Sequence, residues 1–401
     1  MPQKRFAHLN TTPIVPSLPV SSPHLGGAFG KSRRPPGDPV SAPKSYARFI
    51  PPPSTNLVNL ELSLDVILPA QAKEAEDTQQ LVFHTLGDVG GIHGDDVEKA
   101  ISDAMSRQIE KPDKKLNPAF CYLLGDIVYF NGESKLYTSQ FYEPFQSYPG
   151  AIFAIAGNHD GDNHARAGDP VDPEPSLYGF MRNFCDTASR HDSPYRTTMT
   201  QPYVYWTLHT PCATIVGLYS NVDGTLDARG TSEQQQWFEQ QVAHAPTDSA
   251  LIIAVHHPPY SLDTVHGGYP DIEVAIDRVI QATGRLPSAV LSGHVHSYQR
   301  FERDFHGQKV AYVVPGAGGY ANREVLMHRL ESPPHGQKLT KKFGTTHPDL
   351  SLVAYNDTLP GFLRVSIDSN KKTTTLEYFT VPFGGASTAT LSDSATLPWP
   401  K

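Results

Sequence analysis

The sequence is poor in cysteine, with three among 401 residues. Cys121, Cys185 and Cys212 are far apart, odd in number and not arranged in any C-x-x-C pair. Neither a disulfide framework nor a thiolate zinc site is therefore indicated. We expect three free, buried thiols, because free cysteine behaves as a small apolar residue.

The chain also lacks any apolar run of the roughly 18 residues that suggest a membrane-spanning helix. Its N-terminal stretch has no apolar segment of the kind found in secretory signals. No basic block occurs, and 33 Lys and Arg stand against 41 Asp and Glu, a formal charge of -8. Nucleic acid is therefore not an expected partner. We predict a protein without a membrane span, in the cytoplasm, with export by another route left open.

Prolines are distributed unevenly, because 12 of the 36 lie within residues 1–53. Proline cannot donate a backbone hydrogen bond, so we predict that residues 1–55 form a poorly ordered N-terminal arm. Residues 56–384 are expected to form the main domain. Residues 385–401 are small and polar, and we predict a flexible C-terminal tail.

Short apolar segments predict a sheet. Apolar residues alternate with others from position 58 to 68, which is typical of a half-buried edge strand. From position 81 onward, six apolar runs end in polar residues: LVFHTLGD, AFCYLLGD, AIFAIAGNHD, ATIVGLYSN, ALIIAVHHP and SAVLSGHVH. Continuous apolar runs are typical of strands that are covered on both faces. The pattern predicts an α/β fold.

Helix signals lie between these runs. Residues 95–110 fit a helix, as do residues 232–245, where Ser232 and Gln235 have the spacing of a capping box. We expect Trp237, within the second segment, to pack in the core.

Other segments have little periodicity. Residues 161–202 and 321–350 are expected to form rims beside a site. The sequence GAGGY at 316–320 lacks the lysine of a phosphate-binding loop and predicts a tight turn.

Polar residues follow the predicted strands at seven positions: Asp88, Asp126, Tyr129, Asn158, His256, His294 and His296. The carboxyl ends of strands in α/β folds meet at one edge, where sites form. Carboxylate, amide and phenolate oxygens suit hard cations, and imidazole suits iron or zinc. We therefore expect a site for two metal ions. The alternative is that these residues only cap strand ends and turns.

The order of these motifs resembles that of the calcineurin-like metallophosphoesterases, because LGDVGG, LGDIVY, GNHD, AVHHPP and GHVH occur in sequence. Within this superfamily the chain looks most like the purple acid phosphatases and related enzymes. Gly90 stands where other branches carry a histidine, and Tyr129 follows Asp126 by three residues. The resemblance covers roughly residues 81–382. It implies a four-layer α-β-β-α sandwich with two mixed sheets.

The resemblance also assigns the metal ligands. One ion would be bound by Asp88, Asp126, Tyr129 and His296, and the other by Asp126, Asn158, His256 and His294. The carboxylate of Asp126 would bridge them. A phenolate favours Fe(III) at the first position, with Zn, Mn or Fe(II) at the second. The nucleophile would be a water activated by the two ions.

Further histidines lie close to these motifs. In the family, a histidine at the position of His159 lies over the substrate phosphate and assists departure of the alcohol, and we expect Asp160 to orient its ring. His266 would face the substrate, or be an exposed loop residue. We assign no role to His84, His93, His164 and His257, which are expected on the surface or in the core.

The resemblance implies hydrolysis of small phosphate monoesters. Two metals do not distinguish a monoester from a diester, so a phosphodiesterase acting on cyclic nucleotides or phospholipid-type diesters is the first alternative. The second is a non-catalytic binding or scaffold protein that retains the fold, with the Pro-rich arm as a docking segment. The oligomeric state is not predictable from these features.

Overall fold

The computed structural model describes residues 48–56, 59–92, 94–109, 117–163, 174–322, 327–330, 343–344, 347–384 and 387–401. The helical elements are α1 (Leu64–Ile67), α2 (Pro69–Thr78), α3 (Asp96–Ile109), η2 (Ser134–Leu136), η3 (Thr138–Tyr142), α4 (Asn158–Gly161), α5 (Tyr178–Phe184), α6 (Glu233–His244) and α7 (Pro270–Thr283). The strands are β1 (Glu61–Ser63), β2 (Gln80–Leu86), β3 (Phe120–Leu123), β4 (Ala151–Ala154), β5 (Trp206–His209), β6 (Ala213–Leu218), β7 (Ala250–Val255), β8 (Ala289–Leu291), β9 (Tyr298–Phe305), β10 (Gln308–Pro315), β11 (Phe343–Gly344), β12 (Leu350–Asn356), β13 (Gly361–Asp368), β14 (Thr373–Thr380) and β15 (Thr390–Pro398).

These strands form two mixed sheets. The described strands of one sheet are ordered β1-β5-β6-β7-β8-β10-β9-β12-β11, and those of the other β15-β14-β13-β2-β3-β4. Within the first sheet β6, β7 and β8 are parallel, and within the second β2, β3 and β4 are parallel. The predicted pair of mixed sheets is confirmed.

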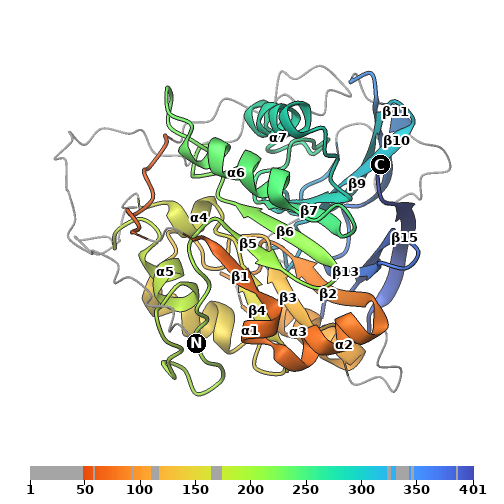
Figure 1. Cartoon of the computed structure of the whole chain (residues 1–401). Coiled ribbons are helices and arrows are strands. Elements are labelled where there is room, and N and C mark those ends of the chain that lie inside the picture. Colours follow the sequence, from red (N-terminus) through yellow and green to blue (C-terminus); the bar gives the residue numbers. More distant parts are fainter. Residues whose placement is uncertain are drawn as a thin grey trace.

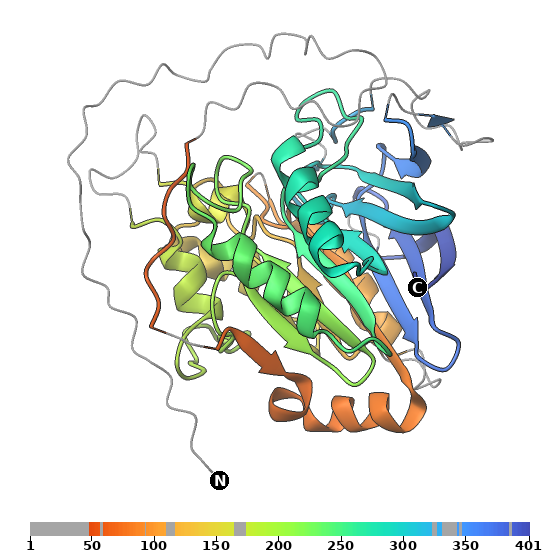
Figure 2. The same cartoon turned by 45° about the horizontal axis from the view of Figure 1, so that its top comes forward.

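Helices cover the outer faces of both sheets. In Figure 1, α6 and α7 lie on one side of the molecule, whereas α3 lies on the opposite side. Figure 2 brings α6 and α7 forward over the nine-stranded sheet. The order helix, sheet, sheet, helix gives the expected four layers.

The largest apolar cluster fills the space between the sheets. Tyr122 on β3 and Trp206 on β5 stack across this interface with ring centroids 5.9 Å apart, and both are fully buried. Full burial of a large apolar side chain stabilises folding by about 2–3 kcal/mol. The three cysteines are free and buried, as predicted. The interface fixes the two sheets relative to each other and therefore positions their strand ends.

A second cluster lies under α6 and α7. Phe238 and Val242 of α6 pack there with Ile272 of α7. Trp237 is partly buried against both clusters, which agrees with its predicted packing role.

The predicted capping box at the start of α6 is wrong. Ser232 precedes the helix but makes no side-chain capping bond. The carboxylate of Asp227 accepts bonds from the backbone N–H groups of Gln234 and Gln235, both at 2.9 Å. An acceptor seven and eight residues upstream thus satisfies these two N–H groups, which no helix carbonyl can reach.

The segment before the main domain is only partly as predicted. The edge strand is the three-residue β1, and Leu64 begins a helical turn, α1, instead of continuing the strand. Of the predicted arm, residues 1–47 lie outside the described residues. Ile50 is held against the main domain, because its backbone N–H and carbonyl both bond to the side-chain amide of Asn221, at 2.8 and 2.7 Å.

The C-terminal segment is not a flexible tail. Residues 390–398 form β15, which pairs with β14 at the edge of the six-stranded sheet. Asp393 accepts hydrogen bonds from the Tyr298 hydroxyl and the Arg300 guanidinium, both at 2.7 Å. Arg300 and Asp393 are 7% and 15% exposed, so this ion pair is largely removed from water. Backbone pairing and this pair together fix the segment.

Within the described parts of the chain, each helix is too short or too polar to cross a membrane. The cytoplasmic location stays a prediction.

We predict that Asp393→Ala lowers the free energy of unfolding by about 3 kcal/mol, because the change leaves the buried charge of Arg300 without its main partner. Glu302 retains one contact with Arg300 at 3.1 Å, which limits the loss. Chemical denaturation measures the difference. Ser394→Ala, at the exposed neighbouring position, is the matched control and should change stability by less than about 0.5 kcal/mol. Equal stability of both variants would contradict the anchoring role of β15.

Candidate metal centre

The seven predicted ligands all lie just after strands. Asp88, Asp126 and Asn158 follow β2, β3 and β4 of the six-stranded sheet. The histidines at 256, 294 and 296 follow β7 and β8 of the nine-stranded sheet. Because each set of strands is parallel, its carboxyl ends share one edge. The site therefore forms where the two sheets bring these edges together.

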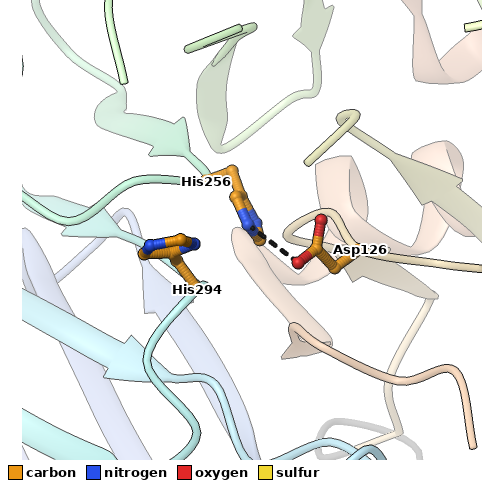
Figure 3. A group of neighbouring side chains, drawn as sticks. All are labelled: Asp126, His256 and His294. Carbon is orange, nitrogen blue, oxygen red and sulfur yellow. Dashed lines mark ion pairs between the residues drawn. The ribbon is translucent and has the colours of Figure 1, made fainter. Parts of the chain in front are cut away.

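One group of ligand atoms surrounds Asp126. The ligand atoms of Asp126, His256 and His294 all lie within 4.8 Å of one another (Figure 3). The His256 Nε2 lies 3.3 Å from the Asp126 Oδ2 and 3.0 Å from the Asn158 Oδ1. The His294 Nδ1 lies 2.9 Å from the same Asn158 oxygen. The sequence-predicted set of Asp126, Asn158, His256 and His294 is thus brought together.

A second group surrounds Tyr129. Its hydroxyl lies 3.3 Å from the Asp88 Oδ1 and 3.4 Å from the His296 Nε2. The His296 Nε2 lies 3.5 Å from the same Asp88 oxygen. The three groups are buried, with Tyr129 2% exposed.

These separations fit shared cations. Two ligands that are each about 2.0–2.2 Å from one ion lie about 2.9–3.5 Å apart in tetrahedral or octahedral geometry. The six pairwise distances of 2.9–3.5 Å given above fall in this range. Carboxylate, phenol, amide and imidazole are also the donors that iron, zinc and manganese accept. The residues present therefore fit a two-metal centre.

Burial shifts the pKa values of the ionisable groups at this edge. Burial, reinforced by the nearby Asp126, raises the pKa of Asp88 to about 8. Burial would also raise the pKa of Asp126, but the histidines at 256 and 159 outweigh it and hold that pKa below its usual value. Although burial alone would lower it, Asp126 raises the pKa of His256 to about 9. The two buried carboxylates therefore favour positive charge at this edge.

Three predicted ligands have strained backbones. Asp88, Asp126 and His294 have φ angles of 60°, 54° and 66°, in the left-handed region. Such conformations cost of order 1 kcal/mol or more for a residue with a Cβ, and they cluster at functional sites. Each turns the chain sharply after its strand, so the side chain remains at the sheet edge.

The predicted role of Asp160 is wrong. Its carboxylate accepts hydrogen bonds from the backbone N–H groups of Ile127, Val128 and Gly157, at 3.1, 3.3 and 2.8 Å. The ring of His159 bonds through Nδ1 to the carbonyl of Phe130 instead, at 2.7 Å. Asp160 therefore holds the loop after Asp126, and a backbone carbonyl orients the His159 ring.

The two other histidines with predicted roles, His159 and His266, lie beside the ligands. His159 is half-buried and its backbone N–H donates to the Asp126 Oδ1, at 2.8 Å. The ring of His266 lies 4.2 Å from that of His294, between ring centroids. His266 is therefore close to the ligand set, and its role toward substrate stays a prediction.

Sequence reasoning missed several neighbours of the site. The Tyr269 hydroxyl lies 2.8 Å from the His294 Nε2. His257 is fully buried, bonds to the Ser220 hydroxyl at 2.7 Å and lies 4.3 Å from the His294 ring. The adjacency of His257 to His256 was the only signal available for it.

The structure also tests the predictions for the GAGGY segment at 316–320 and for His84. The GAGGY segment does turn after β10, and its Tyr320 N–H donates to the Asp88 carbonyl at 3.0 Å. His84 is a buried core residue bonded to Tyr148 and Gln108, as expected. His93 and His164 lie outside the described residues.

Two known proteins resemble part of the chain in sequence. Purple acid phosphatase 18 of Arabidopsis thaliana is 24% identical over 187 residues, which cover 44% of this chain and 40% of that protein. Purple acid phosphatase 22 of the same plant is 28% identical over 109 residues, 26% of this chain and 24% of that protein. The matches thus span less than half the length of these relatives.

A solved structure and a family model extend the likeness. A purple acid phosphatase from yellow lupin (Lupinus luteus) seeds has a TM-score of 0.56 and 15% identity, covering 80% of this chain and 54% of that one, which supports the same fold. The model described as calcineurin-like phosphoesterase matches residues 76–298, more than half of the chain. The protein therefore belongs to the calcineurin-like phosphoesterase family, and the purple acid phosphatases are among its relatives.

Proposed function

We propose that this protein hydrolyses phosphate monoesters at a two-metal centre. The observation that carries the proposal is the convergence of two ligand groups on the edge that Asp88 and Asp126 share. The family is one of phosphoesterases, and the named relatives are phosphatases. The two-metal mechanism and the preference for monoesters are the parts of the proposal that extend beyond the family match.

The two groups have distinct donor sets. Asp88, Tyr129 and His296 would hold one cation, and Asn158, His256 and His294 the other, with Asp126 between them. Burial beside the two carboxylates raises the pKa of the Tyr129 phenol well above its usual value. The phenolate form there requires a strongly acidic cation, so we assign Fe(III) to this position. Zn, Mn or Fe(II) suits the other.

Two histidines beside the ligands would act on the bound phosphate ester. Bound together, the two cations would supply Lewis acidity and a water of lowered pKa. His159 donates its Nδ1–H to the Phe130 carbonyl, and in the imidazolium form its Nε2–H would give its proton to the departing alkoxide oxygen, which leaves the ring neutral. We expect His266, whose ring lies 4.2 Å from that of His294, to contact the phosphate.

The substrate class is testable with two chromogenic esters. We predict that the metal-loaded protein hydrolyses nitrophenyl phosphate at least tenfold faster than bis-nitrophenyl phosphate, measured as kcat/KM. A preference for the diester would favour the phosphodiesterase alternative. No hydrolysis of either ester by protein that holds two metals would favour a binding or scaffold role.

Asp126→Asn should lower kcat by at least about 10³-fold, because the neutral amide of the same shape cannot bridge two cations. Thermal unfolding and circular dichroism should show a folded protein. Asp248→Asn changes an exposed aspartate before β7 and should retain full activity. A near-normal rate for the Asp126 variant would count against the proposal.

The packing of Gly125 gives an independent prediction. Gly125 has φ +93°, and a Cβ there would lie 2.7 Å from the His256 Nδ1 and 2.6 Å from the Gly157 nitrogen. Gly125→Ala should therefore displace His256 and lower both the metal content and kcat/KM more than tenfold.

Gly307, in the hairpin between β9 and β10, is the matched control. Its φ is +88°, and an added Cβ would meet no atom within 4 Å. Gly307→Ala should cost about 1 kcal/mol of stability from backbone strain and leave metal content and activity unchanged. Equal activity of the two variants would contradict the proposed importance of the contact.

A further inference from the structure

His328, which the sequence did not single out, is fixed beside the ligand set. Its backbone N–H donates to the carbonyl of His296 at 3.0 Å. Its neighbours are also tied down: the Arg329 carbonyl accepts from the Thr264 N–H at 2.8 Å, and Leu330 bridges to Asp263. The backbone at His328 and the two residues after it is therefore held in place.

One hydrogen bond defines the tautomer of His328. The backbone N–H of His296 donates to the His328 Nδ1, at 3.2 Å. An N–H group can only donate, so this Nδ1 is the acceptor and the ring carries its proton on Nε2. The Asp263 Oδ2 lies farther from Nδ1, at 3.7 Å. Its carboxylate accepts bonds from Ser261 Oγ–H and from the N–H groups of Val265, His266 and Gly267.

The His328 Nε2–H is an available donor. No hydrogen-bond partner for Nε2 occurs among the described residues, and the side chain remains 12% exposed. This atom lies at the other end of the ring from the edge that Nδ1 anchors. A fixed ring with one free N–H suits recognition of an oxygen anion.

The ring also forms a second layer over the ligands. It stacks on His296 with ring centroids 4.2 Å apart and planes at 20°. It lies 4.9 Å from His266, whose own ring lies 4.2 Å from His294. Thus His266 and His328 each lie against the ring of one ligand histidine.

We propose that His328 is a substrate-binding residue whose Nε2–H donates to a phosphate oxygen of the ester. This inference rests on the proposed function, because it requires an anion bound at the metal ligands. The His266 ring lies 4.9 Å from that of His328, so the two histidines adjoin one another beside the ligands.

Two amide substitutions separate this role from a structural one. In His328→Asn the amide oxygen reproduces the Nδ1 acceptor for the His296 N–H, and the Nε2 donor is lost. In His328→Gln the amide N–H takes the position of the Nε2–H donor, and the Nδ1 acceptor is lost. The probe is inorganic phosphate, titrated calorimetrically into metal-loaded protein, with metal content measured on the same samples.

We expect His328→Asn to raise the Kd of phosphate about tenfold, the effect of losing one hydrogen bond to a charged group. KM for nitrophenyl phosphate should rise by a similar factor with kcat changed less than threefold, and metal content should stay at the wild-type level. His328→Gln should bind phosphate more tightly than the Asn variant.

An Asn variant with wild-type phosphate affinity or with lost metal would overturn the proposal, as would a Gln variant that binds no more tightly than Asn. If the wild type binds phosphate but hydrolyses neither ester, the proposed function fails, while the binding comparison still decides the role of His328.

Discussion

Two carboxylates that the fold removes from water impose the main constraint on this site. Asp88 and Asp126 are 0% and 1% exposed, at the edge where the two sheets meet. Buried carboxylates remain charged only beside positive charge, and leaving them uncompensated costs several kcal/mol. The backbone also holds Asp88, Asp126 and His294 in left-handed conformations. The packed interface between the sheets offsets this strain, and two cations would supply the missing charge.

The α/β class and the positions of the candidate ligands were predictable from local patterns, whereas the four-layer arrangement and the division of the ligands between two ions came from the family resemblance. Apolar runs that are buried on both faces identify strands such as β6 and β7, and polar residues directly after the runs mark their carboxyl ends. The topology then requires little further information, since parallel strands carry their ends to one edge. The seven ligands predicted from motif order accordingly lie in two clusters. The ligands' backbone strain and burial were not readable from residue order.

What the sequence could not predict depends on tertiary contacts. β15 is an edge strand of mainly small and polar residues in which Leu397 is the one buried side chain, so its sequence carries little apolar signal, and its pairing with β14 defines it. Asp160 neighbours His159 in sequence, yet adjacent residues on a helical turn point in different directions, and its carboxylate reaches the Asp126 loop instead. His328 lies in a segment without periodicity and reaches the site through backbone contacts with His296.

Metal stoichiometry, measured together with the visible spectrum, tests the central claim most directly. Elemental analysis of purified, metal-loaded protein should give two ions per chain, one of them iron, with an absorption band from tyrosinate bound to Fe(III) that disappears in Tyr129→Phe. A fully folded chain that retains one ion or none after loading would contradict the claim that two cations neutralise the buried carboxylates.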